Sequence, residues 1–198
     1  MRNYTKLPAL DIAQGSYCMR AVQDADIEPI RQWRNAQMDV LRQEHPIDEG
    51  AQKAYFTKAV WPQMLLAEPS QILVTLLHDH EPIAYGGFVH VSWTHRRAEL
   101  SFLADPDIAR DESRYSHALS HYLALIRVVG FERLRFNRLY LETYAMRTAH
   151  IALLERNGFA LEGTMREHVL IGERYCDSLI HGCLRDEWRH RTPDHSEE

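Results

Sequence analysis

The sequence predicts one α/β domain in which helices cover both faces of a mixed β-sheet. Apolar strand-like runs alternate with stretches whose apolar residues recur at helical spacing. The predicted elements follow the order β-α-α-β-β-β-α-β-α-β-β, which mixes neighbouring strands with strands separated by helices. No linker segment and no internal repeat interrupts this order. We therefore expect a single domain over residues 1–188 and a polar, disordered tail over residues 189–198.

The first half of the chain predicts four strands and two helical regions. A short strand at "YCMRA" is followed by Asp24, a typical helix N-cap, and by apolar residues at helical spacing. The stretch from Ile47 to Met64 is a second helical region, limited by Pro62. Two apolar runs around a polar turn in "ILVTLLHDHEPIAYGGFVHV" are typical of a hairpin. A further strand, Arg97–Ala104, ends at an Asp-Pro pair.

The second half alternates helices with strands and ends in a hairpin. A helix is predicted from Ser113 to Val129, because its apolar residues share one face. The strand "FNRLYLETY" and the helix "MRTAHIALLERNG" follow. Two long strands then meet at "IGER", a turn that contains glycine.

Composition and charge argue against several classes of function. The net charge of −5 and the pI near 6.2 disfavour nucleic-acid binding, which normally needs a basic face. No apolar run approaches the roughly 18 residues of a membrane span. The N-terminus lacks the apolar core of a signal peptide. We therefore expect a cytoplasmic protein without nucleic-acid or membrane partners.

The cysteines and histidines predict neither a disulfide nor a metal centre. Cys18, Cys176 and Cys183 are scattered and outside any CxxC spacing, which is typical of reduced thiols. His117 and His121 have the spacing of a zinc pair on a helix, but no further ligand type stands at a recognisable spacing.

The segment from Arg138 to Phe159, "RLYLETYAMRTAHIALLERNGF", carries the strongest signal of function. A strand-like run ends on a carboxylate and two hydroxyls immediately before a helical pattern. The longer stretch "LYLETYAMRTAHIALLERNGFALEG" resembles the GNAT acetyltransferase superfamily, whose pattern is a strand ending in Glu-Val and then Asn-x-x-Ala-Ile-x-Leu-Tyr-x-x-x-Gly-Phe. The residues that fit this pattern without a gap are Glu142, Ile151, Leu153, Glu155, Gly158 and Phe159.

The resemblance implies a three-layer fold with a mixed, mostly antiparallel, seven-stranded sheet. A V-shaped splay is expected between the fourth and fifth strands, Arg97–Ala104 and Phe136–Tyr144. The pantetheine arm of acetyl-CoA, the implied co-substrate, lies in that splay in this family. Backbone groups near Phe102 and Leu103 would bind its amides, and one N–H would polarise the thioester carbonyl.

A strand that ends beside the splay places its last polar side chains, Glu142 and Tyr144, in the cleft. The resemblance gives Glu142 the role of the base that deprotonates the acceptor amine, directly or through water. The alternative for Glu142 is a carboxylate stabilised by the dipole of the following helix. Glu99 is expected to face the same cleft, with a cross-strand salt bridge to an arginine as its alternative.

The chain departs from the family pattern at the helix of this motif. The tyrosine that usually protonates the leaving thiolate is Leu154 here, the usual asparagine is Arg147, and the usual alanine is His150. If an acid is needed, Tyr144, Tyr115 and His150 are the candidates. The alternative for Tyr115 is apolar packing, and the alternative for His150 is a partly buried helix histidine without a catalytic role.

The loop expected to bind the pyrophosphate of acetyl-CoA lacks its usual glycines, which are replaced by Arg114 and Ser116. Backbone N–H groups, hydroxyls and arginines at a helix N-terminus can still bind phosphate. Asp111 and Glu112 oppose an anion and are expected to cap the helix. The residues expected to hold the co-substrate are Arg110, Ser113, Arg114, Ser116 and Arg147.

The acceptor site is expected between the first two helices and on the last hairpin. An aromatic face and hydrogen-bond donors suit an amino sugar, and an arginine would bind a nucleotide phosphate. A surface loop with one buried tryptophan is the alternative for the first segment. The candidate acceptor-binding residues are Trp33, Arg34, Arg42, His168 and His181.

These features predict an acyl-CoA-dependent N-acyltransferase that moves the acetyl group of acetyl-CoA to a primary amine. The final hairpin resembles that of ribosomal-protein N-terminal acetyltransferases and of acetyltransferases acting on amino-sugar nucleotides. A nucleotide-linked amino sugar is the preferred acceptor and a peptide N-terminus the alternative. A non-catalytic GNAT-like module that holds a ligand or partner, or a structural subunit that dimerises, is the competing interpretation. A homodimer is compatible with each of them.

Overall fold

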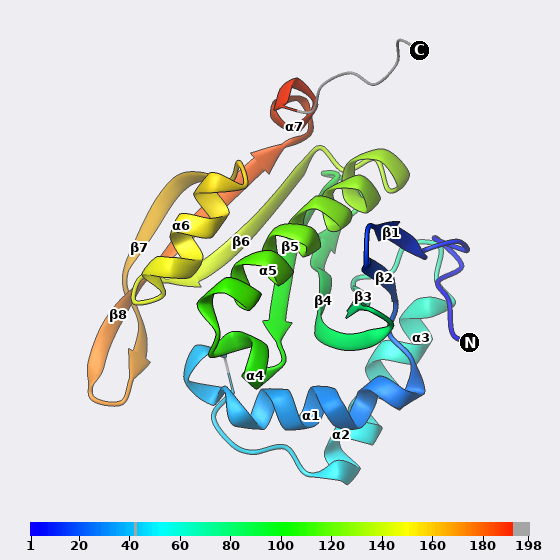
Figure 1. Ribbon diagram of the computed structural model, residues 1–198, viewed down its shortest axis with the longest axis horizontal. Helices are drawn as coiled ribbons and strands as arrows, with labels where there is room; N and C mark the ends of the chain where they lie inside the picture. Colours follow the sequence, from blue (N-terminus) through cyan, green and yellow to red (C-terminus); the bar gives the residue numbers. More distant parts are fainter. Residues whose placement is uncertain (42, 192–198) are drawn as a thin grey trace.

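The computed structural model describes residues 1–41 and 43–191, and an eight-stranded sheet forms its centre (Figure 1). The strand order is β1-β2-β3-β4-β5-β6-β8-β7, and only β5 and β6 are parallel neighbours. The predicted mixed, mostly antiparallel sheet is confirmed. The strands are β1 Ile12–Gln14, β2 Tyr17–Ala21, β3 Ile72–His78, β4 Glu81–Ser92, β5 Arg97–Ala104, β6 Arg138–Tyr144, β7 Ala160–Ile171 and β8 Arg174–Leu184.

The predicted number of seven strands is wrong, because a short additional strand, β1, precedes the first predicted one. β1 pairs with β2 from Ile12↔Met19 to Gln14↔Tyr17. The connection contains Gly15, whose φ of 60° lies in the left-handed region that glycine adopts without strain. A strand of 3 residues is too short to show the alternation by which strands are recognised in a sequence.

The predicted helical regions appear in the predicted order; α4, α7 and two 3-10 turns, Asp24–Asp26 and Met38–Val40, are additions. Two π-helical turns lengthen predicted helices. Phe56–Val60 continues α2, and Val128–Arg133 continues α5. Pro62 stands in the first turn of α3, where a missing N–H is tolerated, so the helical stretch runs on to Met64. The α-helices are α1 Ile27–Ala36, α2 Glu49–Tyr55, α3 Trp61–Met64, α4 Pro106–Ala109, α5 Glu112–Arg127, α6 Thr148–Arg156 and α7 Arg185–Arg191.

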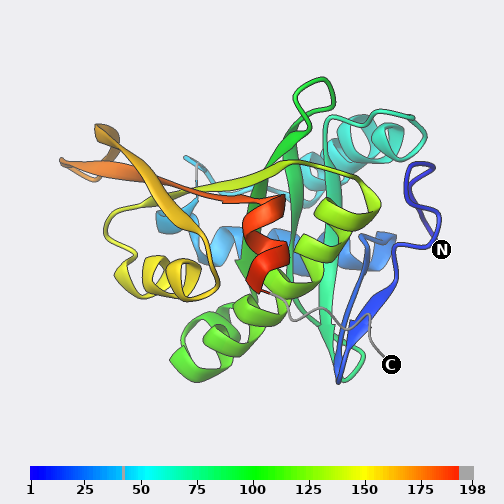
Figure 2. The same cartoon turned by 90° about the horizontal axis from the view of Figure 1, so that it is seen from above.

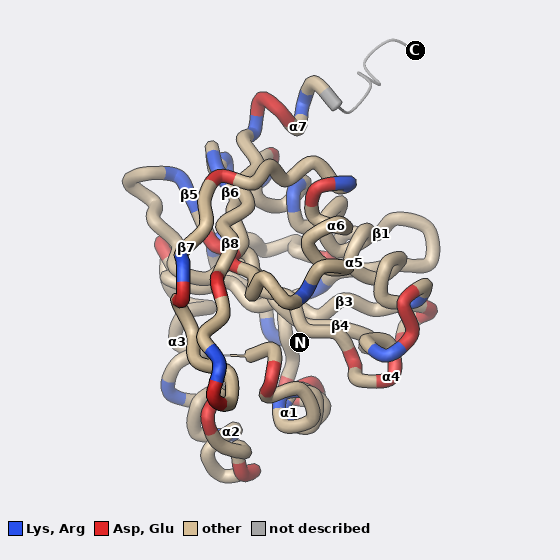
Figure 3. The backbone as a smooth tube through the Cα atoms, turned by 90° about the vertical axis from the view of Figure 1, so that its left-hand side faces the viewer, with Lys and Arg blue, Asp and Glu red and all other residues tan. Residues whose placement is uncertain are grey.

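Helices cover both faces of the sheet, as predicted. α5 and α6 lie over one face, and α2 and α3 lie over the other (Figures 2 and 3). β3, in the interior of the sheet, is buried from Ile72 to Leu77 without alternation. A near-continuous apolar run is what a strand covered on both sides requires.

One buried tyrosine fixes α5 against the strands next to the predicted splay. The hydroxyl of Tyr122 donates to the carbonyl of Ser101 on β5 at 2.6 Å and accepts from the N–H of Gly87 on β4 at 2.8 Å. Gly86 permits this close packing, because a Cβ there would lie 2.0 Å from the Ser101 carbonyl oxygen. The helix is thereby held beside the middle of β5.

A buried ion pair joins β2 to the start of α1. The Asp26 carboxylate accepts from Arg20 Nη1 at 2.6 Å, Arg20 Nη2 at 2.9 Å and the Thr75 hydroxyl at 2.7 Å. Burial opposes ionisation of Asp26, but the bonds from Arg20 and Thr75 outweigh it, so the pKa of Asp26 is lowered. The first helix is thus anchored by a charged group that is 2% exposed.

The last described helix, α7, spans the predicted end of the domain. α7 continues to Arg191, past the predicted end at residue 188. Trp188 packs against Phe131, with ring centroids 5.4 Å apart, which attaches this helix to the core. The rest of the predicted tail, residues 192–198, lies outside the described residues.

Candidate active site

β5 and β6 separate after a short paired segment, as the resemblance implies. Their pairing ends at Glu99↔Tyr140, whereas β5 continues to Ala104 and β6 to Tyr144. On their outer sides β5 stays paired with β4 and β6 with β8. In the described chain, the inner edges of both strands beyond the last pair therefore have no partner strand. Their backbone N–H and C=O groups are available to a ligand.

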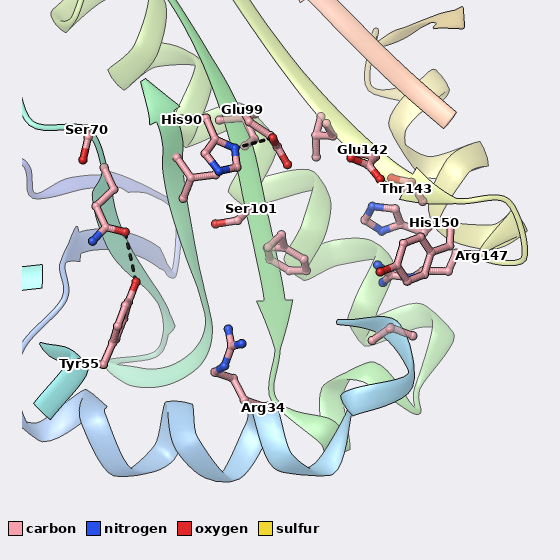
Figure 4. Close-up of a pocket in the computed structure, with 17 residues that line it drawn as sticks. Arg34, Tyr55, Ser70, His90, Glu99, Ser101, Glu142, Thr143, Arg147 and His150 are labelled. Carbon is pink, nitrogen blue, oxygen red and sulfur yellow. Dashed lines mark hydrogen bonds and ion pairs between the residues drawn. The ribbon is translucent and has the colours of Figure 1, made fainter. Parts of the chain in front are cut away.

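A cavity of about 600 Å³, called cavity A below, lies at this separation (Figure 4). β5 lines it from Glu99 to Phe102, and β6 lines it from Leu141 to Tyr144. Arg34 of α1 and Tyr55 of α2 are part of the remaining lining, with Gln71 just before β3. The four predicted catalytic residues, Glu99, Glu142, Tyr144 and His150, thus share one cavity.

A second cavity, called cavity B, has a volume of about 540 Å³ and is lined by the end of α1, by α4, and by the starts of α5 and α6. Val40, Arg147 and His150 line both cavities. The two cavities therefore meet at the start of α6. A ligand lying across this boundary would extend from cavity B into the separation between β5 and β6.

Two carboxylates of the open strands face cavity A. Glu142 has 11% of its side chain exposed, and its Oε1 lies 3.6 Å from Nε2 of His168 on β7. Glu99 has 14% exposed, and its Oε2 lies 2.9 Å from Nδ1 of His90 on β4. A histidine, His90, is thus a cross-strand partner of Glu99. Each carboxylate therefore stands beside an imidazole ring.

The sequence carries no signal for several polar residues of cavity A. His90 reaches Glu99 where the pairing of β4 with β5 shifts between Val89 and Ser92, and its φ is 47°. Such irregularities in strand pairing change the direction of side chains near functional sites. No pattern of residues in the sequence indicates the irregularity at His90. Tyr55, whose hydroxyl lies 3.3 Å from Gln71 Oε1, enters the lining through helix packing alone.

Tyr115, His150 and Arg147 form a hydrogen-bonded cluster at the boundary of the two cavities. The Tyr115 hydroxyl lies 2.7 Å from His150 Nδ1 and accepts from Arg147 Nη2 at 3.0 Å. Burial, with smaller contributions from Arg147 and His181, lowers the pKa of His150 to about 3. The ring is therefore neutral near pH 7. With the ring proton on Nε2, the Tyr115 hydroxyl can donate to Nδ1 while it accepts from Arg147.

The same cluster contains a hydroxyl suited to proton donation. Burial raises the pKa of Tyr115, although Arg147 opposes the shift. Tyr115 is therefore protonated in the resting protein and has a cation in contact that would stabilise its oxygen after the proton leaves. Leu154, at the family's tyrosine position, is fully buried in the core.

The residues predicted to bind acetyl-CoA on β5 and at the start of α6 lie at the cavities. Phe102 lines cavity A. The side chain of Leu103 is buried in the core, so only its backbone is left for a ligand. Arg147 lines both cavities, and Arg110 lines cavity B, where Asp107 accepts from its Nη1 at 2.8 Å.

The start of α5 differs from the expected phosphate loop. Asp111 is its N-cap, and the Oδ1 atom accepts from the N–H of Arg114 at 3.0 Å. Ser113 and Arg114 are exposed, and they line neither cavity, nor does the half-buried Ser116. The helix capping expected of Asp111 is confirmed, and an anion at this terminus would have to compete with it.

The predicted acceptor residues divide into two groups. Arg34 points from α1 into cavity A (Figure 4), and His168 lies at its edge beside β6. Trp33 and His181 are buried, and neither lines cavity A or B. Arg42 lies outside the described residues.

Neither a metal centre nor a membrane-spanning helix is found in the described chain. Within residues 1–41 and 43–191, no three His, Cys, Asp or Glu side chains form a group that could hold a metal ion. No described helix is both long and apolar enough to cross a membrane. The cysteines Cys18, Cys176 and Cys183 are free thiols.

A model of the acetyltransferase (GNAT) domain matches residues 19–180 of the chain. The chain belongs to the GNAT acetyltransferase family. The predicted class, an acetyl-CoA-dependent N-acetyltransferase, is thereby confirmed.

Among solved structures, this GNAT domain is similar to spermidine N-acetyltransferases from Vibrio cholerae. A complex with CoA and spermine has a TM-score of 0.75 at 18% identity and covers 89% of this chain and 99% of that chain. A dodecameric form has a TM-score of 0.73 at 17% identity and covers 91% of this chain and 100% of that chain. At this identity the likeness establishes the fold. No significant match is found among curated proteins.

Proposed function

We propose that this protein transfers the acetyl group of acetyl-CoA to the primary amine of a small molecule bound in cavity A. The observation that carries the proposal is the meeting of cavities A and B at Arg147 and His150, beside the open edges of β5 and β6. A co-substrate extending from cavity B would end where Glu142 and Glu99 line cavity A.

Acetyl-CoA supplies an activated thioester carbonyl, and the residues placed to hold it surround the separation of the strands. The inner-edge backbone groups of β5 after Glu99 can pair with the pantetheine amides, as an added strand would. One of these N–H groups can stabilise negative charge on the carbonyl oxygen. Arg110 and Arg147, the arginines that line cavity B, can bind phosphate oxygens.

Glu142 is the proposed general base for the acceptor ammonium. Its carboxylate lies in cavity A, is mostly buried, and has His168 3.6 Å away as a route for the proton toward solvent. The alternative base is Glu99, which with His90 forms a second acid–base pair in the same cavity.

Tyr115 is the proposed proton donor to the departing thiolate. Its hydroxyl lies at the boundary of the cavities, and Arg147 would stabilise the oxygen left behind. One proton of the ammonium then reaches solvent and another replaces the one that Tyr115 donates, so the products are an amide and the CoA thiol. Tyr144, which also lines cavity A, is the second candidate acid.

The acceptor within this reaction class is a matter of proposal. The similar solved structures are spermidine N-acetyltransferases, one of them bound to spermine, which suggests a polyamine. The hairpin formed by β7 and β8 resembles that of enzymes acting on amino-sugar nucleotides or on ribosomal-protein N-termini. A small molecule is favoured over a peptide because cavity A has walls from α1, α2, β5 and β6.

The decisive experiment measures CoA release with Glu142→Gln and Tyr115→Phe variants. Glu142→Gln should lower kcat by about 10²–10⁴-fold with little change in acetyl-CoA affinity, because only the proton acceptor is removed. Part of this loss should be recovered at high pH, where more of the amine is already neutral. Tyr115→Phe should lower kcat without that recovery. If Glu142→Gln has the kcat and the pH–rate profile of the wild type, Glu142 is not the general base and Glu99 takes that role.

A ligand-binding module without turnover is the second candidate function. The observation that favours it is the start of α5, where Asp111 occupies the cap of a helix that lacks the family's glycines. Such a module would be stabilised by acetyl-CoA in a thermal unfolding assay yet release no CoA with any amine. Self-association as a homodimer and a cytoplasmic location stay predictions.

A further inference from the structure

Arg34 is a partly buried cation of cavity A that is paired with no carboxylate in the described part of the chain. Its Nε donates to Gln43 Oε1 at 3.0 Å and its Nη1 to the Tyr85 hydroxyl at 3.0 Å. Both partners are neutral, and a guanidinium group has further N–H donors that these bonds leave unused. A charge withdrawn from water without a counter-ion is unfavourable unless a ligand supplies one.

The neighbouring loop holds Arg34 in place. Gln43, which accepts from Arg34, donates from Nε2 to Asn35 Oδ1 at 2.9 Å. Asn35 is itself fixed by the backbone of Ile47, accepting from the N–H at 2.8 Å and donating to the carbonyl at 2.8 Å. A side chain fixed in this way loses little conformational freedom when it binds a ligand. The network therefore favours a role for Arg34 in ligand binding over that of a surface residue that only contacts solvent.

The position of Arg34 relates it to the acceptor rather than to acetyl-CoA. It lines cavity A but not cavity B. With Tyr55 and Tyr85 it also lines a recess of about 280 Å³ between α1 and α2, called cavity C. Glu99 and Glu142 lie on the strands that face Arg34 in Figure 4. The proposed acceptor site thus has carboxylates on its strand side and, on its α1 side, a cation that pairs with no carboxylate of residues 1–41 and 43–191.

We propose that the acceptor carries an anionic group, a carboxylate or a phosphate, that binds Arg34 while its amine lies at Glu142. This inference rests on the proposed N-acetyl transfer in cavity A. An arginine fork suits both anions, since each offers two oxygens to parallel N–H donors. A linear polyamine has no such group, and a second ammonium near Arg34 would be repelled.

Matched pairs of amines test the proposal by CoA release from the wild-type protein. L-Phenylalanine is compared with 2-phenylethylamine, which lacks only the carboxylate. A uridine-diphosphate-linked amino sugar is compared with the methyl glycoside of the same sugar, and spermidine is the polycationic reference. At least one anionic member should have a kcat/KM about tenfold or more above its neutral partner, the usual value of a charge-assisted hydrogen bond. The pair that shows the preference identifies carboxylate or phosphate.

Substitutions of Arg34 assign the preference to this residue. Arg34→Met should raise the KM of the anionic acceptor by about tenfold or more and leave the KM of its neutral partner unchanged. Arg34→Lys should have a KM for the anionic acceptor between those of the wild type and Arg34→Met, because an ammonium group cannot form the two parallel hydrogen bonds of a guanidinium group. Arg156→Met, an exposed site on α6 that lines none of cavities A, B and C, is the matched control and should behave as wild type.

The failure of this inference is distinguishable from that of the proposed function. The anion site is refuted if the wild type has the same kcat/KM for all amines, or if Arg34→Met lowers kcat/KM equally for every acceptor. N-acetyl transfer in cavity A stands in both cases. Absence of CoA release with every amine refutes the proposed function. Calorimetry of the same pairs with CoA present then tests the anion site alone. The anion site is supported if the wild type binds the anionic amine and Arg34→Met does not. It is overturned if the wild type and Arg34→Met bind this amine equally well.

Discussion

Single residues at the start of α6 show how burial sets protonation. His150 is buried, its Nδ1 lies 2.7 Å from the Tyr115 hydroxyl, and the charge of Arg147 contributes to lowering its pKa. Protonation of the ring would remove the acceptor of the Tyr115 hydroxyl and place a second cation beside Arg147. The neutral ring is thus part of the arrangement that keeps Tyr115 ready to donate its proton.

We predict that His150 makes the folded protein less stable in acid. The pKa of histidine is about 6.5 in an unfolded chain and about 3 at this site, so between these values the unfolded state binds more protons. Stability is then fully present above about pH 6.5 and falls as the pH decreases toward 3. The contribution of His150 between pH 7 and pH 5 should be a loss of about 2 kcal/mol.

Urea unfolding of wild type and His150→Gln at pH 7 and pH 5 measures this contribution. Other titrating groups contribute equally to the two proteins. The difference between wild type and variant in the pH dependence of the free energy of unfolding is therefore due to His150. The wild type should lose about 2 kcal/mol more than the variant over this interval. Identical losses would mean that His150 is as easily protonated in the folded protein as in the unfolded one.

Helices and strands are joined by interactions of very unequal strength, and the Arg20–Asp26 pair between β2 and α1 is a strong one. Arg20→Met would leave the Asp26 carboxylate buried with only Thr75 and backbone donors, and should lower the free energy of unfolding by about 3–5 kcal/mol. The exposed pair of Arg2 and Asp24, at 2.8 Å, is the control. Arg2→Met should lower it by roughly 0–1 kcal/mol. Similar losses in urea unfolding of both variants would contradict the anchoring role of Asp26.

The whole molecule is divided by the separation of β5 and β6. One part of the sheet contains β1 to β5 and the other β6, β8 and β7, and the two are paired directly only from Arg97↔Arg138 to Glu99↔Tyr140. Beyond this segment the strands expose backbone groups to cavity A rather than to each other. A ligand between them would connect both parts of the sheet.

We predict that acetyl-CoA protects the open strands from hydrogen exchange. Amides of residues 100–104 and 141–144 should exchange more slowly when the co-substrate is bound, because some pair with it and the rest lose access to solvent. Amides of Ile72–Leu77 in β3 are the internal control. Their exchange rates should change only by the amount that the change in global stability on binding explains. Protection confined to the start of α5 would place the co-substrate outside the separation.

The amino-acid sequence by itself determined the types and order of the elements and the family. The reason is local: helical and strand periodicities and the motif from Glu142 to Phe159 are contained in contiguous residues. The same local reading identified Glu142 and Glu99 as cleft carboxylates, and both line cavity A. It missed β1, α4 and α7, which have 3, 4 and 7 residues and are too short to form a clear pattern.

Only the tertiary structure decided which polar side chains share the site. His90 meets Glu99 through an irregular pairing of β4 with β5, and Tyr115 of α5 meets His150 of α6 across 35 positions of sequence. In the described part of the chain no carboxylate pairs with Arg34, although nearby residues in the sequence are acidic, while Trp33, its neighbour in the chain, is buried in the core. These outcomes depend on strand register and helix packing between distant segments, which local periodicity does not specify.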